Sequence, residues 1–259
     1  MAFRALCHQL DCITASSTVT RDLLLEVGVK TRIEVIPNGV DLKRFRPARD
    51  EDERTGLRVS LGIDRQAQVI LFVGAIHPRK GVDLLLEAWV HLARCFPDAH
   101  LYLIGMRHDL NTPQLADFRG KVKALIRASS AVDRVHLVGY TQNVEEYLRA
   151  ADLLVFPSRW EGMGNAVLEA MASALPVVLT PFLGLPPDFG QPDREYLLVD
   201  HDFGAIAAAV RRLMEHAELR AKLGKRGRQW VQDTMDVERT LDRYAELYRD
   251  LARHCRTSG

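Results

Sequence analysis

The sequence predicts an α/β fold in which a Rossmann-like parallel sheet carries helices on both faces. Six short apolar runs have the composition of buried strands, and stretches with helical spacing separate most of them. Three of the runs end directly at Gly74, Gly139 and Pro157, where a polar loop begins. Strands that alternate with helices in this way are typical of a parallel sheet covered on both faces.

The regular part of the chain begins near residue 68. Strands are predicted at residues 69–73, 101–104, 135–138, 153–156, 177–180 and 196–199, and helices at residues 82–96, 115–129, 144–151, 166–173 and 203–214. Two more helices follow, over residues 218–234 and from residue 237 to about residue 253. In the last helix an apolar stripe recurs at three- and four-residue intervals and is expected to be buried; it consists of Leu241, Tyr244, Leu247, Tyr248 and Leu251.

The first part of the chain is too short to enclose a core of its own. It reads as a weak helix over residues 3–10, a strand over 12–15, a helix capped by Ser17 and ended by Gly28, and a strand over 32–36 that stops at Pro37-Asn38-Gly39. We interpret these residues as the tail of a domain whose beginning is absent. The charged residues 50–54 are expected to form a solvent-exposed loop.

Composition excludes several classes of protein. The 259 residues are 47% hydrophobic, which is ample for a buried core, and 35 basic against 34 acidic residues leave no overall field that would attract nucleic acid. No apolar run approaches the ~20 residues that span a bilayer. Residues 1–11 carry several polar side chains and therefore lack the core of a signal peptide.

Cysteine and histidine patterns do not indicate a metal site. The cysteines Cys7, Cys12, Cys95 and Cys255 form no CxxC pair, as expected for reduced thiols of a cytoplasmic protein, and the nine histidines show no HExxH spacing. The triplet Asp200-His201-Asp202 is interpreted as a polar turn and helix cap rather than a ligand set. We therefore expect no metal and no cofactor.

The most informative stretch runs from residue 155 to residue 171, where a strand passes into a helix. Gly162 and Gly164 would let the backbone come close to a ligand, and the amide groups at the start of the next helix favour an anion such as phosphate. Glu161 lies in this loop, and Glu169 is the only charge in the apolar helix that follows. The alternative reading is a surface loop whose two carboxylates are solvated.

A second loop is expected at the same edge of the sheet. It begins at Gly74 and contains Arg79 and Lys80, whose charges could neutralise a diphosphate or simply be solvated beside a helix start. A third loop carries Tyr140, which could stack on a base or only cover the sheet. The spacing alone leaves both alternatives open.

Residues 161–169 resemble the donor-site signature of retaining GT-B glycosyltransferases of family 4, in which seven residues separate two carboxylates. Four further segments are similar to that family: Phe156-Pro157-Ser158, Leu175-Pro176-Val177-Val178, Lys80-Gly81 and the linker Pro37-Asn38-Gly39. The resemblance extends from about Cys12 to the end of the chain. It implies a remnant of an amino-terminal acceptor domain with its linker (residues 1–40), a nucleotide-sugar donor-binding domain (41–236) and a carboxy-terminal crossover helix (237–259).

The resemblance also implies roles. Glu169 would hold the ribose hydroxyls, Glu161 the hydroxyls of the sugar, and Lys80 would stabilise charge on the departing diphosphate. Ala75 stands where the family has an arginine, and Arg79 would substitute for it. Lys80 and Glu161 are the predicted catalytic residues, and the predicted donor-binding residues are Gly74, Arg79, Lys80, Tyr140, Glu161, Gly162, Met163, Gly164, Asn165 and Glu169. Asp188 matches a family loop only loosely.

The implied reaction is transfer of a hexose from a nucleotide sugar to an acceptor with retention of configuration, in glycan, polysaccharide or glycolipid synthesis. Two alternatives stay open: a non-catalytic nucleotide-sugar-binding module, and a nucleotide-sugar epimerase. A second chain, or a second copy, could cover the edge of the incomplete domain. Peripheral contact at the inner membrane face is a further option because of a basic cluster, although a solvated helix face is favoured; the cluster is Arg211, Arg212, Lys222, Lys225, Arg226 and Arg228.

Overall fold

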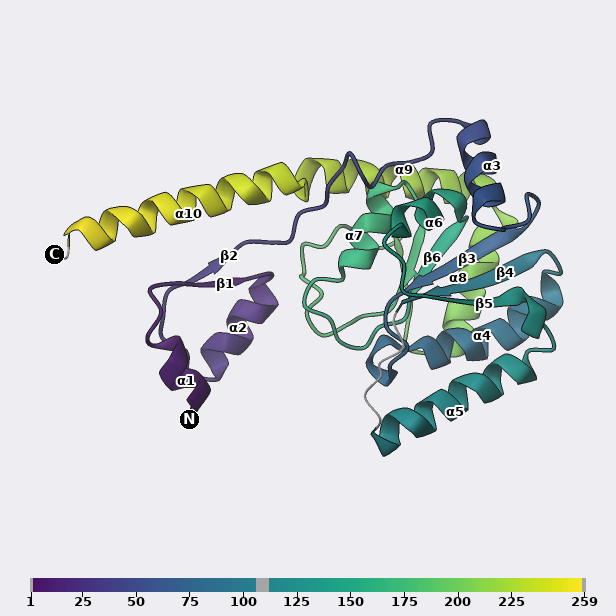
Figure 1. Cartoon of the computed structure of the whole chain (residues 1–259), viewed down its shortest axis with the longest axis horizontal. Coiled ribbons are helices and arrows are strands. Elements are labelled where there is room, and N and C mark those ends of the chain that lie inside the picture. Colours follow the sequence, from purple (N-terminus) through teal and green to yellow (C-terminus); the bar gives the residue numbers. More distant parts are fainter. Residues whose placement is uncertain (1, 106–111, 258–259) are drawn as a thin grey trace.

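The computed structural model describes residues 2–105 and 112–257, and a six-stranded parallel sheet forms the middle of its larger part (Figure 1). The strand order is β5-β4-β3-β6-β7-β8. The strands are β3 (Gln68–Val73), β4 (Ala99–Ile104), β5 (Val135–Gly139), β6 (Leu153–Phe156), β7 (Val177–Leu179) and β8 (Leu197–Leu198), and each neighbouring pair is parallel. The predicted α/β class is confirmed.

Helices cover both faces of the sheet, and strand residues alternate between the two cores as the period of two requires. On one face Ile70 and Phe72 pack under α4 (Val82–Cys95), α5 (Pro113–Ala128) and α8 (Phe203–Glu215). On the other face Val69 and Leu71 pack under α6 (Val144–Ala150), α7 (Asn165–Ala172) and part of α9 (Ala217–Thr234). Two 3₁₀ turns, η1 (Pro78–Lys80) and η2 (Val132–Arg134), lie in the connections.

The order of the strands creates a topological switch point. From β3 the chain builds outward to β4 and β5, whereas from β6 it builds in the opposite direction to β7 and β8. The connections that follow β3 and β6 therefore lead to opposite halves of the sheet, and the carboxyl ends of the strands at such a switch point are the usual ligand position in open α/β sheets.

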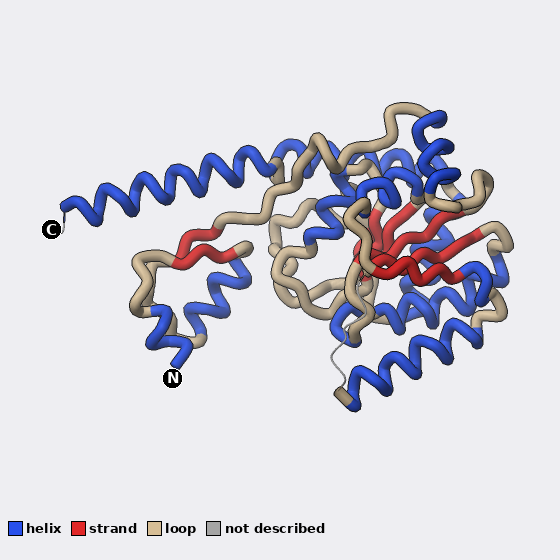
Figure 2. Tube along the Cα trace, viewed as in Figure 1, coloured by secondary structure: helices blue, strands red, loops and turns tan. Residues whose placement is uncertain are grey.

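A small amino-terminal unit lies apart from the sheet (Figure 2). It contains α1 (Ala2–Cys7), β1 (Ile13–Ala15), α2 (Thr18–Glu26) and β2 (Ile33–Val35), with β1 and β2 paired in parallel. Ser17 caps α2 by accepting a hydrogen bond from the Thr20 amide, as the sequence predicted, and Gly28 ends the following turn at φ 82°.

The last helix, α10 (Val237–Thr257), extends from the sheet domain along this unit (Figure 1). Arg32 pairs with Asp250 at 2.6 Å, and the Thr240 hydroxyl donates to the Pro37 carbonyl at 3.1 Å. Within this chain the apolar stripe of α10 is only partly buried. Leu247 is buried, whereas Leu241 and Tyr248 are 56% and 65% exposed.

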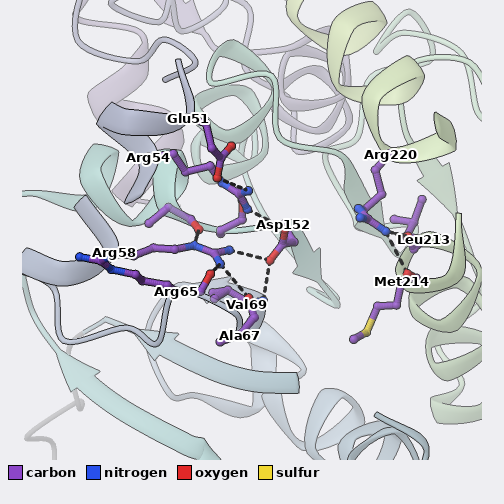
Figure 3. A network of polar contacts seen from close by, with 12 residues as sticks. Glu51, Arg54, Arg58, Arg65, Ala67, Val69, Asp152, Leu213, Met214 and Arg220 are labelled. Carbon is purple, nitrogen blue, oxygen red and sulfur yellow. Dashed lines mark hydrogen bonds and ion pairs between the residues drawn. The ribbon is translucent and has the colours of Figure 1, made fainter. Parts of the chain in front are cut away.

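The predicted loop at residues 50–54 is also wrong, because these residues begin helix α3 (Glu51–Ser60). Asp50 caps the helix by accepting from the Glu53 amide, and three acidic residues in the first turn favour its dipole. Figure 3 shows what holds α3: Arg54 and Arg58 both reach Asp152, at 2.6 and 2.9 Å.

Three shorter expectations concern the cap of α8, membrane-spanning helices and the cysteines. Asp202 accepts from the Ala205 amide and caps α8, as predicted for the residue 200–202 turn. Over residues 2–105 and 112–257, no helix combines the length and apolar character needed to cross a bilayer. Cys7, Cys12 and Cys95 are free thiols, whereas the side chain of Cys255 lies outside the described residues.

Candidate functional site

A cavity of about 400 Å³ opens at the switch point between β3 and β6. Its lining combines the two strand-end loops, the start of α7 and two residues of the amino-terminal part of the chain. The lining residues are Ser16, Asn38, Val73, Gly74, Lys80, Phe156, Glu161, Gly162, Met163, Gly164, Asn165, Ala166 and Glu169. The predicted carboxylates and lysine thus meet in one place.

Glu161 lies at the centre of the polar contacts. Lys80 Nζ is 2.6 Å from Glu161 Oε1, and the Ser158 hydroxyl donates to the same oxygen at 2.5 Å. Arg79 Nη1 is 3.5 Å from the other oxygen, Oε2. Because Glu161 is only 8% exposed, these contacts offset the cost of burying its charge.

Lys80 reaches the cavity from η1, which the sequence builds in a few steps. Pro78 starts the turn, and His77 Nδ1 accepts from the Arg79 amide. Gly81 then takes the left-handed conformation (φ 65°), where a Cβ atom would lie 1.9 Å from the Pro157 carbonyl oxygen. This close approach locks the β3 loop against the β6 loop and fixes the distance between Lys80 and Glu161.

The start of α7 faces the cavity. Gly164 precedes the helix with φ 71°, a conformation that other residues rarely adopt. Its carbonyl accepts from the Val167 amide at 2.8 Å, whereas the amides of Asn165 and Ala166 at the helix start make no backbone hydrogen bond among the described residues. Gly162 differs from expectation: it does not take a positive φ, and an added Cβ would meet only Ser16 Oγ at 3.7 Å. Its lack of a side chain keeps space open rather than permitting unusual backbone geometry.

Glu169 lies one turn into α7 and lines the same cavity. The pKa of its carboxyl is raised to about 7, mainly because of burial; the charge of Arg44 lowers this pKa in part, and that of Glu145 raises it. Among the described residues, none donates a hydrogen bond to this carboxylate. Ligand hydroxyl groups would supply the missing donors.

Two predicted site residues lie outside the lining. Arg79 donates to the Trp160 carbonyl at 2.9 Å and stacks over the Trp160 ring. It therefore contacts Glu161 from outside the cavity. Tyr140 is 68% exposed at the end of β5, and its predicted contact with a base stays a prediction. In the loosely matched 184–188 loop, Gly184 packs against the Glu161 backbone, and Asp188 does not line the cavity.

Sequence reasoning missed three polar residues of the site. Ser158 orients Glu161, but the sequence predicts no role for it beyond its place in a segment similar to the family. Asn38 belongs to the linker turn, and its side-chain amide donates to Asn165 Oδ1 at 2.9 Å. Ser16 follows β1. Neither Asn38 nor Ser16 carries a local pattern that places it beside residues more than a hundred positions away.

The structure is that of an α/β protein with a parallel sheet and a crevice at its switch point, lined by a lysine, two carboxylates and a helix start, and these groups suit an anionic ligand rich in hydroxyl groups. The chain belongs to the family described as glycosyl transferases group 1, whose model matches residues 53–230. A second model, glycosyltransferase family 4, matches residues 1–44.

The chain is similar to curated glycosyltransferases. A lipopolysaccharide core biosynthesis mannosyltransferase of Rhizobium meliloti (strain 1021) is 30% identical over 222 residues, which is 85% of this chain and 61% of the relative. Mannosylfructose-phosphate synthase of Agrobacterium fabrum is 34% identical over 179 residues, 68% of this chain and 38% of the relative. The chain therefore spans about two fifths to three fifths of these relatives' length.

Solved structures share the fold, which is that of GT-B glycosyltransferases. Sucrose-phosphate synthase from Thermosynechococcus elongatus superposes with a TM-score of 0.83 at 29% identity, covering 98% of this chain and 61% of that one. The carboxy-terminal domain of a group 1 glycosyl transferase from Francisella tularensis superposes with a TM-score of 0.68 at 26% identity, covering 77% of this chain and 100% of that one.

Proposed function

We propose that this chain binds a nucleotide sugar and transfers its hexose to an acceptor with retention of configuration. The single observation that carries the proposal is the convergence of Lys80, Glu161 and Glu169 on one cavity at the start of α7. A nucleotide sugar offers each of them a suitable group. Its diphosphate suits the lysine and the helix start, and its ribose and hexose hydroxyls suit the carboxylates.

The proposed roles are those that the resemblance to family 4 glycosyltransferases implies, and the chemistry of each side chain suits them. Lys80 stabilises the negative charge that develops on the diphosphate when the bond to the sugar breaks. Glu161 accepts hydrogen bonds from the hydroxyls of the sugar, and Glu169 from those of the ribose. The amides of residues 162–165 bind the sugar and phosphate. Lys80 and Arg79 supply the positive charge in this scheme, which requires no metal, and an assay with and without a chelator tests that point.

Residues 41–236 are proposed as the donor-binding domain, with residues 1–40 and 237–259 belonging to the acceptor side and the crossover helix. A structural neighbour, the Anabaena HepE protein, was solved in complex with UDP-glucose; at 20% identity it supports the fold rather than the choice of donor. A cytoplasmic location, membrane contact through the basic cluster and a second chain stay predictions.

Thermal-shift measurements with UDP, GDP and ADP, and with their glucose and mannose esters, test donor binding directly. One base and one sugar are expected to raise the unfolding temperature most, since a ligand that binds only the folded state stabilises it. No shift with any nucleotide sugar would refute the proposal.

Lys80→Ala tests the catalytic assignment. Removing one charge-stabilising group from a preorganised site lowers turnover by roughly 10²–10³-fold. Lys121→Ala is a matched control, because Lys121 pairs with Asp83 and Glu87 outside the cavity. Near-normal turnover of Lys80→Ala, measured by release of the nucleoside diphosphate, would contradict the assignment.

A second candidate is a nucleotide-sugar-binding module that is not catalytic by itself. Donor hydrolysis and transfer assays on the purified chain separate the two. Tight donor binding with neither hydrolysis nor transfer would favour the module, and product analysis without an acceptor would reveal an epimerase.

A further inference from the structure

Glu161 already forms an ion pair with Lys80, the side chain proposed to bind the diphosphate. Glu161 Oε1 lies 2.6 Å from Lys80 Nζ, and Oε2 lies 3.5 Å from Arg79 Nη1. The side chains of Lys80 and Glu161 are only 15% and 9% exposed, so water and salt screen this pair weakly. A diphosphate that binds Lys80 must therefore compete with Glu161.

The carboxylate is fixed in place. The buried Ser158 hydroxyl donates to Glu161 Oε1 at 2.5 Å, and the Ser158 carbonyl in turn accepts from the Thr180 hydroxyl at 3.0 Å. The Glu161 amide donates to the Leu183 carbonyl at 3.1 Å. Because side chain and backbone are both held, Glu161 stays beside Lys80 when an anion arrives.

This arrangement treats two related ligands differently. A nucleotide sugar carries an esterified phosphate and presents neutral hydroxyl groups, which can donate hydrogen bonds to Glu161 while the phosphate contacts Lys80. A free nucleoside diphosphate keeps its ribose hydroxyls but lacks the sugar hydroxyls that would donate to Glu161, and its terminal phosphate carries more negative charge. Like charges placed together are disfavoured, and a repulsive element of this kind is how sites reject unwanted ligands.

We propose that Glu161 selects the intact nucleotide sugar over the nucleoside diphosphate product by competing with the product for Lys80. The proposal rests on the function proposed above and adds a step to it. Once the sugar has been transferred, the diphosphate lies next to a fixed carboxylate whose hydrogen-bond donors have left. Repulsion then promotes product release.

Inorganic pyrophosphate is the probe, because it tests the cation site without depending on the base or the sugar. Calorimetric titration of the full chain compares the unaltered protein with Glu161→Gln and Glu169→Gln. Glu161→Gln is expected to bind pyrophosphate about tenfold more tightly, since it removes a negative charge beside Lys80. Glu169→Gln is the matched control: it removes a carboxylate of the same cavity whose charge interacts with Arg44 and Glu145.

Two further variants keep the test decisive. Lys80→Gln combined with Glu161→Gln is expected to lose the gain in affinity, because Glu161 acts through Lys80. Ser158→Ala loosens the carboxylate without removing its charge, so it is expected to tighten pyrophosphate binding by a smaller factor. Unfolding curves of each variant establish that the fold is retained, and Ser158→Ala decides the outcome if Glu161→Gln does not fold.

Titrations with each nucleoside diphosphate and its sugar ester complete the experiment. Glu161→Gln is expected to shift the ratio of the two affinities toward the diphosphate. Pyrophosphate binding that is unchanged or weaker in both Glu161→Gln and Ser158→Ala would overturn the proposal. If Glu161→Gln gains pyrophosphate affinity but no nucleotide sugar binds any form of the protein, the proposed function fails while the competition for Lys80 stands.

Discussion

Glu169 is held in the folded protein at a cost that its proposed task explains. Its neighbours on α7 are apolar, and burial raises the pKa of its carboxyl from 4.5 to about 7. The folded state therefore binds more protons than the unfolded state between these two values. Relative to high pH, protonation of the Glu169 carboxyl stabilises the folded state. This stabilisation is fully present below pH 4.5 and is lost as pH rises through about 7. Functional carboxylates often lower stability in this way.

Glu169→Gln is expected to be more stable than the unaltered protein at about pH 8, by up to roughly 3 kcal/mol, because it removes the buried charge. The difference is expected to shrink as pH falls toward 4.5, where the carboxyl is protonated in both states. Urea unfolding at several pH values measures it. A stability difference that does not change with pH would contradict the raised pKa.

Gly162 and Gly164 make a matched pair in one loop. Gly164→Ala is expected to lower stability by about 1–2 kcal/mol, because a residue with a side chain would have to adopt the left-handed conformation. Its Cβ would also lie 3.1 Å from the Phe182 ring. Gly162→Ala has free space and is expected to change stability by less than about 0.5 kcal/mol. Equal losses in thermal unfolding would contradict the backbone argument.

At this scale the sequence could predict which side chains meet but not how they are oriented. The meeting of Lys80 with Glu161 follows from the rule that parallel strands bring their carboxyl ends to one edge of a sheet. The position of the Ser158 hydroxyl, and the direction of the Arg79 side chain toward the Trp160 carbonyl, depend on how two loops about 80 residues apart pack together. That packing has no local sequence signal.

Among the elements, α3 shows how ion pairs can hold a helix with few apolar residues. Arg58 is 4% exposed and donates to the carbonyls of Ala150, Arg65 and Ala67 as well as to Asp152. Asp152 also accepts from the Val69 amide at 2.7 Å, so the network connects α3 to the amino-terminal ends of β3 and β6 (Figure 3). It lies at the amino ends of the strands, opposite the cavity.

Arg58→Met is expected to lower stability by about 3–5 kcal/mol, because it removes one partner of a buried ion pair and leaves three carbonyls without their donor. Arg49→Met serves as control, since Arg49 is 75% exposed and its pair with Glu53 is a surface contact. That variant is expected to lose less than about 1 kcal/mol. Urea unfolding compares the two, and similar losses would show that the network is not stabilising.

The same helix shows where element prediction from sequence fails. The predicted bounds of the six strands agree with the structure to within one or two residues, because their apolar runs are bounded by glycine, proline or charge and those of the four inner strands β3, β4, β6 and β7 are mostly buried. In α3 the apolar pattern is weak: the helix has three acidic residues in its first turn and Gly56 at its centre. Its stability comes from Asp152, which is distant in sequence.

At the scale of the whole molecule, the cavity belongs to two bodies. The sheet domain supplies most of the lining, whereas Ser16 and Asn38 come from the amino-terminal side. Two connections hold these bodies together, the linker after β2 and the helix α10 (Figure 1). Val40 and Asp236 pair where the two connections meet, so they leave the sheet domain side by side.

Leu247 of α10 is 8% exposed and lies beside Glu34 and Ile36 of the amino-terminal part, next to the ion pair between Arg32 and Asp250. Leu247→Asp buries an unpaired charge there and is expected to free the unit from the helix. Hydrogen exchange at the amides of β1 and β2 should then accelerate while the amides of β3 and β6 stay protected, because the sheet domain has its own core. Donor affinity should fall as Ser16 and Asn38 leave the cavity.

Leu241→Asp on the same helix alters a residue that is 56% exposed, and it is expected to leave both measurements unchanged. Identical exchange in the two variants would show that α10 does not position the amino-terminal unit.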